Sequence, residues 1–214
     1  MARTTRRAAS AGDHVPVSWH TLVVMSEDGS PAGAATLARQ HMSSMGDRWA
    51  HVLAVGSLAA KLAAQTRHVP DVVVAAAWLH DIGYAPHVRS SGFHPVDGAD
   101  FLAARHAPSE LVSLVAYHSG AAYEAEERGL AAKLAAFGEP EQTNLDMLTL
   151  VDMSTGPTGI RVSVHQRLAE ILTRYDTDHP VHRAITRSRE SLIESCVRAA
   201  RLLDLSDEWV FAPV

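Results

Sequence analysis

Cysteine is almost absent from this sequence of 214 residues, which contains one, Cys196. A single cysteine excludes an intramolecular disulfide and favours a reducing, cytoplasmic compartment. Long apolar runs are missing as well, because the longest covers only 72–79, whereas about 20 apolar residues are needed to span a bilayer. We therefore predict a soluble cytoplasmic protein that has no membrane partner.

Basic charge is not in excess, since the formal net charge is -5 and the isoelectric point is near 6.2. This balance argues against general nucleic-acid binding but is compatible with a local basic pocket for an anionic substrate. Strand-like alternation and repeats of fixed period are also missing. With 47% hydrophobic residues, the chain can build one sizeable core.

The sequence pattern from residue 33 onward is helical. Apolar residues recur every three or four positions, and Gly, Pro and Ser separate the periodic segments. We predict an all-α fold with a flexible extension at 1–32 and a single compact helical bundle at 33–214. Asp47 is the expected N-cap of the second helix, and a long C-terminal helix is expected from about residue 180. The predicted helices cover 34–42, 48–65, 71–82, 95–106, 109–119, 121–137, 143–153, 162–175 and 180–205.

Histidine and aspartate side chains interrupt or end several of these apolar helices. His51 lies on an apolar stripe, His80 and Asp81 follow the run "VVVAAAWL", and Asp152 follows "LTLV". A buried imidazole or carboxylate needs a partner, and a divalent cation compensates the burial. Two imidazoles and two carboxylates suit Mn, Fe, Mg, Zn, Co or Ni and leave positions open for water or substrate.

Two further histidines lie between the His-Asp pair and the final aspartate. His94 begins the predicted helix of "HPVDGADFL", and His118 ends the one of "LVSLVAYHSG". A second cation that shares Asp81 with the first would need nitrogen donors of this kind. The sequence therefore predicts one or two divalent ions per chain.

The order His, His-Asp, Asp on helices resembles the HD-domain superfamily of metal-dependent phosphohydrolases over roughly 36–175. The segments "RWAHVLAV", "AAAWLHDIGY" and "LTLVDM" are each similar to family segments, and each contributes a ligand. The resemblance implies a helical bundle in which the first metal is held by His51, His80, Asp81 and Asp152.

The segments around His94 and His118 are similar to those of two-metal members, which include cyclic-dinucleotide phosphodiesterases. Those enzymes have a His-His pair where this chain has His118-Ser119, and the Gly-Tyr-Pro motif that follows it in them is missing here. The six-ligand order also resembles the mixed-valence di-iron oxygenases of the myo-inositol oxygenase kind, which have single histidines at both positions. A third alternative is a metal-stabilised regulatory domain without turnover.

The hydrolase interpretation assigns a metal-activated water to attack a phosphomonoester or phosphodiester, a class that includes nucleotide-like substrates. Asp81 is the expected catalytic residue, which orients that water and accepts its proton. The expected partner is a small phosphorylated molecule, and the C-terminal helix is a candidate surface for a homodimer. The arginines expected to bind the substrate are Arg48, Arg89 and Arg161.

Overall fold

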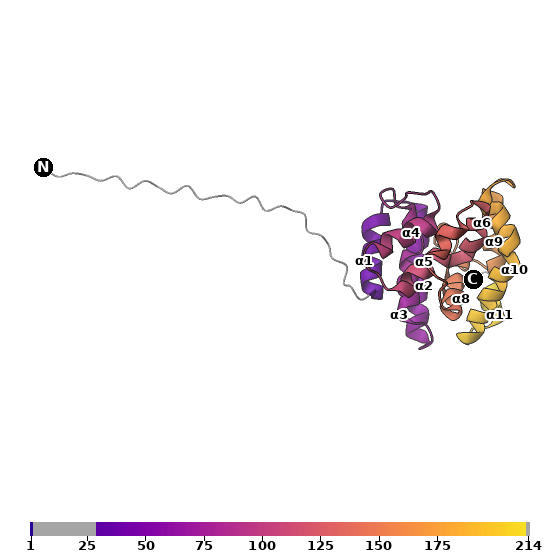
Figure 1. Ribbon diagram of the computed structural model, residues 1–214. Helices are drawn as coiled ribbons and strands as arrows, with labels where there is room; N and C mark the ends of the chain where they lie inside the picture. Colours follow the sequence, from indigo (N-terminus) through magenta and orange to yellow (C-terminus); the bar gives the residue numbers. More distant parts are fainter. Residues whose placement is uncertain (2–28, 213–214) are drawn as a thin grey trace.

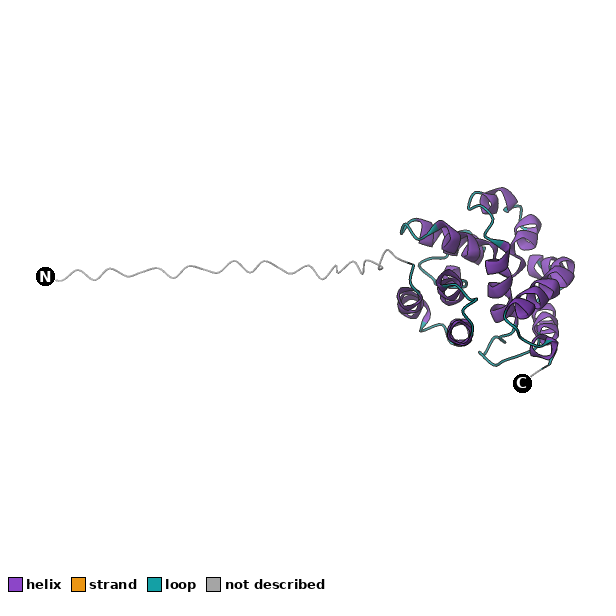
Figure 2. Cartoon of the chain, turned by 90° about the horizontal axis from the view of Figure 1, so that it is seen from below, coloured by secondary structure: helices purple, strands orange, loops and turns teal. Residues whose placement is uncertain are grey.

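Helices carry the regular structure of this computed structural model, which describes Met1 and residues 29–212 (Figure 2). Within these residues the only paired extended positions are Thr155 and Arg161, which form an isolated bridge. The predicted all-α fold is therefore confirmed. The elements are α1 Pro31–Met42, α2 Asp47–Gln65, α3 Asp71–Leu79, η1 Ile82–Tyr84, α4 His94–Ala103, α5 Ser109–Tyr117, η2 His118–Gly120, α6 Ala121–Glu127, α7 Ala131–Ala135, α8 Gln142–Met153, α9 Val164–Arg174, α10 Pro180–Leu202 and α11 Asp207–Phe211, where η marks a 3-10 helix.

Two helices, α3 and α8, lie inside the bundle. Figure 1 shows α1 at one side of the molecule and α10 at the other, and α3 packs against α1, α2, α5 and α8 in between. Most residues of α3 are fully buried, because "VVVAAAWL" offers no polar face to the solvent. A helix that is apolar on every side belongs in the interior. Its position carries the polar pair that follows it, His80 and Asp81, into the core.

Close backbone approaches at two glycines bring the neighbouring helices together. A Cβ atom on Gly56 of α2 would lie 2.3 Å from the Trp78 ring of α3. A Cβ atom on Gly83 of η1 would lie 2.0 Å from the His94 carbonyl oxygen and 2.8 Å from the Gly98 nitrogen. Only glycine fits at these contacts. The second contact sets the start of α4 directly against the turn that follows α3.

A buried ion-pair network fastens the C-terminal helix to α8. Asp146 of α8 is 4% exposed, and it accepts hydrogen bonds from the Arg198 Nε and Nη2 atoms at 2.7 and 2.8 Å. The Ser195 hydroxyl and the Gln142 amide also donate to this carboxylate. Both oxygens of the buried carboxylate are therefore paired, which offsets the cost of removing it from water.

Several helix boundaries differ from the sequence-based predictions. The single helix expected at 121–137 is broken into α6 and α7, because Gly129 adopts a left-handed conformation with φ of 69°. Asp47 is the first residue of α2 and Gly46 is its N-cap, so the predicted cap was wrong by one position. The short helix α11 was not predicted.

The ends of the chain leave one prediction open. The expected extension, 1–32, lies almost entirely outside the described residues, although α1 begins at Pro31.

Cys196 is fully buried on α10, and burial raises the pKa of its thiol to about 12. In the part of the chain that the structure describes, no helix is both long and apolar enough to cross a membrane.

The contact between η1 and α4 predicts a large cost for Gly83→Ala. The added methyl group collides with backbone atoms that cannot rotate away, so we expect a loss of about 3 kcal/mol or more in the free energy of unfolding. Urea denaturation followed by circular dichroism measures it. Gly138→Ala is the control, because open space surrounds Gly138 and only its φ of 71° is strained, for about 1 kcal/mol. Equal losses in the two variants would contradict the contact argument.

Candidate metal centre

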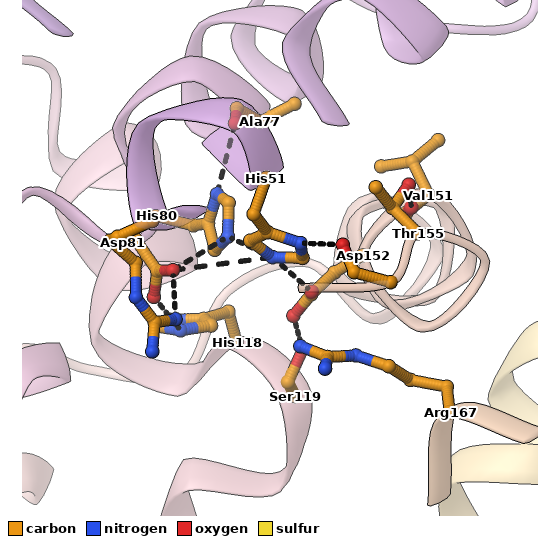
Figure 3. Close-up of polar contacts among 12 residues, drawn as sticks. His51, Ala77, His80, Asp81, His118, Ser119, Val151, Asp152, Thr155 and Arg167 are labelled. Carbon is orange, nitrogen blue, oxygen red and sulfur yellow. Dashed lines mark hydrogen bonds and ion pairs between the residues drawn. The ribbon is translucent and has the colours of Figure 1, made fainter. Parts of the chain in front are cut away.

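Six predicted ligand residues converge from different parts of the chain into one place, and five of them, His51, His80, Asp81, His118 and Asp152, are labelled in Figure 3. Potential ligand atoms within 4.8 Å of one another form a first group from His51, His80 and Asp81 and a second group from Asp81, His94 and His118. Asp152 extends the first group, because its Oδ1 atom lies 3.0 Å from His51 Nε2. Residues that are 101 positions apart in the sequence (152 - 51) are thus brought together.

Asp81 stands between the two groups and directs one oxygen to each. Its Oδ2 atom lies 3.5 Å from His80 Nε2 and 4.0 Å from His51 Nε2. Its Oδ1 atom lies 3.3 Å from His94 Nε2 and 3.9 Å from His118 Nε2. This is the arrangement of a carboxylate that can bridge two cations.

A backbone carbonyl oxygen fixes the orientation of each of three histidine rings. A carbonyl oxygen can only accept, so the Nδ1 atom of each ring carries the proton and, in the neutral ring, Nε2 presents a lone pair. Such a contact is usual for a histidine that binds a metal through its other nitrogen. The pairs are His51 Nδ1 with Gly156 O at 3.1 Å, His80 Nδ1 with Ala77 O at 2.9 Å, and His118 Nδ1 with Val115 O at 2.7 Å.

The lone pairs of these rings therefore face one another. His51 Nε2 lies 3.3 Å from His80 Nε2, so the two ring nitrogens meet inside the site. Asp152 Oδ1 is buried 3.0 Å from His51 Nε2 and has no assigned hydrogen-bond partner among the described residues. In the second group, His94 Nε2 lies 3.2 Å from His118 Nε2. A divalent cation fits this set of acceptors and removes their mutual repulsion.

The titratable groups are held in the charge states that metal binding requires. Burial lowers the pKa of His80 to about 4 and lowers that of His94 well below its usual range. Burial alone raises the pKa of Asp81, but the nearby Arg48 and His80 outweigh it and hold that pKa well below its usual range. Near neutral pH these two imidazoles are neutral and this carboxylate is charged.

Ser119 is a site residue that sequence reasoning missed. Its hydroxyl donates to Asp152 Oδ2, and its backbone has a left-handed φ of 50°, which is uncommon for a residue other than glycine. The hydrogen bond fixes the carboxylate on the side away from His51. The signal available in the sequence was its position directly after His118, although nothing in the sequence shows the backbone strain.

The three predicted arginines have different environments. Arg48 Nη1 donates to Asp81 Oδ2 at 2.7 Å, and its guanidinium lies 4.1 Å from the centre of the Tyr84 ring. Arg89 is exposed and does not line the cavity formed by the described residues. Arg161 donates to backbone carbonyls, at 2.9 Å to Ser154 O and 2.7 Å to Val162 O, and it stacks on the Trp209 ring of α11. These contacts hold the Arg161 guanidinium against the backbone outside the cavity, and the substrate-binding role expected for it stays a prediction.

The two groups of metal ligands, which we call the cation groups, border a cavity. The volume of this cavity, including its open mouth, is about 580 Å³. Arg167 and Arg174 of α9 line it together with Ile171, and the three residues recur at steps of four and three along one helix face. Val181 and Ile185 of α10 add an apolar wall. The spacing of the α9 residues was visible in the sequence, but which helix would face the site was not.

Comparison with known proteins agrees with this geometry. The model of the HD-domain family matches 48–152, a segment that contains all six residues of the two groups. Neither the curated proteins nor the solved structures gave a match to the chain. The order of the ligands, the helical fold and the family match together identify residues 48–152 of this chain as an HD domain.

Proposed function

We propose that this protein is a metal-dependent phosphohydrolase that cleaves a small phosphomonoester or phosphodiester. The observation that carries the proposal is the set of inward-facing histidine Nε2 atoms and carboxylates, which share one cavity with three arginines. A site for an anionic phosphate ester needs positive charge around the phosphate. Metal cations bound by the acceptors would supply part of this charge, and the guanidinium groups supply the rest.

The residues around the cations orient the reacting groups. A divalent cation at these ligands supplies Lewis acidity to a phosphoryl oxygen and lowers the pKa of a water molecule bound beside it. Asp81, which faces both groups, aligns the attacking water. Ser119 holds Asp152 in one rotamer through its hydroxyl, so the ligand geometry does not relax between turnovers. Orientation of this kind contributes to catalysis by reducing the entropy lost at the transition state.

Arg48 is the arginine that pairs directly with Asp81. Its guanidinium is held between the Asp81 carboxylate and the Tyr84 ring, and Tyr84 in turn stacks on His94 with ring centres 4.0 Å apart. The carboxylate raises the pKa of Arg48, which keeps it charged. A fixed cation at this position stabilises negative charge that develops on the phosphoryl oxygens.

A di-iron oxygenase is the second candidate function. The observation that favours it is the second group, in which His94 and His118 each supply a single imidazole beside the shared carboxylate of Asp81. Imidazole and carboxylate ligands suit iron as well as the hydrolytic metals. Oxygen consumption and a di-iron spectrum distinguish this chemistry from phosphate release.

Phosphate release from a panel of phosphate esters tests the proposed function. We expect turnover with at least one of Mn, Fe, Mg, Zn, Co or Ni, loss of turnover after chelation, and recovery when the metal is returned. The chelated protein should also melt at a lower temperature, because the buried acceptors lose the ion between them. Release of phosphate that is insensitive to chelation would contradict the proposal, as would oxygen consumption without any phosphate release.

Asp81→Asn should reduce turnover by at least about a hundredfold while helicity is retained, because the change keeps the side-chain shape and removes the bridging anion. Metal content, circular dichroism and phosphate release are measured on one preparation. Asp176→Asn, at an exposed position far along the chain, is the matched control. Near-normal activity of Asp81→Asn with its metal bound would show that Asp81 neither ligates nor orients.

His94→Ala should lower the number of bound ions by one per chain, because it removes a nitrogen donor from the second group alone. Metal analysis of protein purified without chelator or affinity tag gives the stoichiometry. His68→Ala serves as the control, since His68 is exposed and belongs to neither group. An unchanged content of two ions per chain in His94→Ala would refute this assignment.

A further inference from the structure

A second cavity adjoins the cation groups. It measures about 700 Å³, counting its mouth, and it shares Arg48, His51, Arg167 and Arg174 with the first cavity. These shared residues come from the start of α2 and from one face of α9, so the two helices form the common wall. Asp47 and Glu170 line the second cavity only. The two cavities therefore lie next to each other, with the same four residues between them.

Arg167 carries an unused hydrogen-bond donor at this wall. The residue is 5% exposed, and its Nε atom is buried with no partner among the described residues. Its Nη1 atom donates to Glu170 Oε2 at 2.6 Å. Figure 3 shows the side chain reaching from α9 toward the Asp152 side of the site. A buried guanidinium whose Nε is unpaired is costly, and an anion that accepts from it removes the cost.

Two guanidinium groups of the second cavity share a single carboxylate. The lining of this cavity has three guanidinium groups and two carboxylates, Asp47 and Glu170. Glu170 is shared between two arginines, because Arg174 Nε and Nη2 donate to it at 2.8 and 2.6 Å while Arg167 also binds it. One carboxylate cannot neutralise both guanidinium groups. The carboxylate that pairs with Arg48 is Asp81, which also faces the cation groups.

We propose that the second cavity binds a second phosphate of the substrate, so that the preferred substrates are molecules carrying two separated phosphates. This inference rests on the proposed function, because it assumes that the phosphate to be cleaved lies at the cation groups. The second phosphate contacts Arg167 and Arg174, whose planar guanidinium groups match the oxygen geometry of phosphate. Apolar residues of the first cavity, Ile171, Val181 and Ile185, contact the part of the substrate between the phosphates.

Binding of non-hydrolysable analogues tests the inference without turnover. Alkane bisphosphonates with phosphonates separated by two to eight carbons are compared by calorimetry with alkyl monophosphonates of equal length, using the metal-loaded protein. The bisphosphonate of best-fitting length should bind about tenfold more tightly or better, because it adds charge-assisted hydrogen bonds to a partly desolvated site. The corresponding phosphate esters should show the same preference in KM.

Two matched variants locate the preference. Arg174→Gln should reduce the ratio of bisphosphonate to monophosphonate affinity toward one, since it removes a guanidinium group from the common wall. Arg174 lies at the edge of the cavity with a side chain 32% exposed, so its loss is not expected to unfold the protein. Arg189→Gln, on the exposed face of α10, removes the same charge outside both cavities and should keep the wild-type ratio.

The outcomes separate this inference from the proposed function. Phosphate esters that are cleaved with equal KM for one or two phosphates, and phosphonates that bind equally, would overturn the second-phosphate site and leave the hydrolase intact. A preference that survives Arg174→Gln would also overturn it. Absence of phosphonate binding together with absence of ester cleavage would overturn both.

Discussion

Buried carboxylates beside histidine ring nitrogens need a compensating positive charge. The arrangement of side chains at the centre of the molecule depends on this need. Asp146 shows how the same fold treats an ordinary buried carboxylate, because arginine, hydroxyl and amide donors pair both of its oxygens. Asp81 and Asp152 are equally buried and each has one donor, from Arg48 and Ser119 respectively, but each also directs an oxygen at histidine Nε2 atoms. The contrast between the two environments is what a cation site needs and a structural ion pair does not.

Backbone geometry, more than side-chain chemistry, sets this arrangement. Carbonyl groups near the helix ends fix the tautomers of His51, His80 and His118. The glycine contact between η1 and α4 brings His94 beside Asp81, and the left-handed turn at Ser119 aims a hydroxyl at Asp152. Backbone contacts keep the ligand side chains in place even though these side chains repel one another. The ligands therefore stay preorganised.

Negative and positive groups lie on different sides of the site. Acceptors surround the cation groups, whereas guanidinium groups gather on the wall formed by α2 and α9. The apolar residues of α10 close the side between them. In the proposed function, cations recognise the reacting phosphate and arginines recognise the rest of the substrate, and the low exposure of Arg167 strengthens such recognition by limiting competition from water.

The sequence by itself determined the helical class and the six ligand candidates, because apolar periodicity and buried polar residues are local signals. His51, His80 and Asp152 stand on or beside apolar runs, and such runs must enter a core wherever the helices finally pack. Tertiary structure alone decided which arginines face the site: Arg161 clamps backbone carbonyls beside α11, while Arg167 and Arg174 line the cavity. A charged side chain on an amphipathic helix is compatible with solvent, an ion pair or a pocket, and only the packing of other helices against it distinguishes these environments.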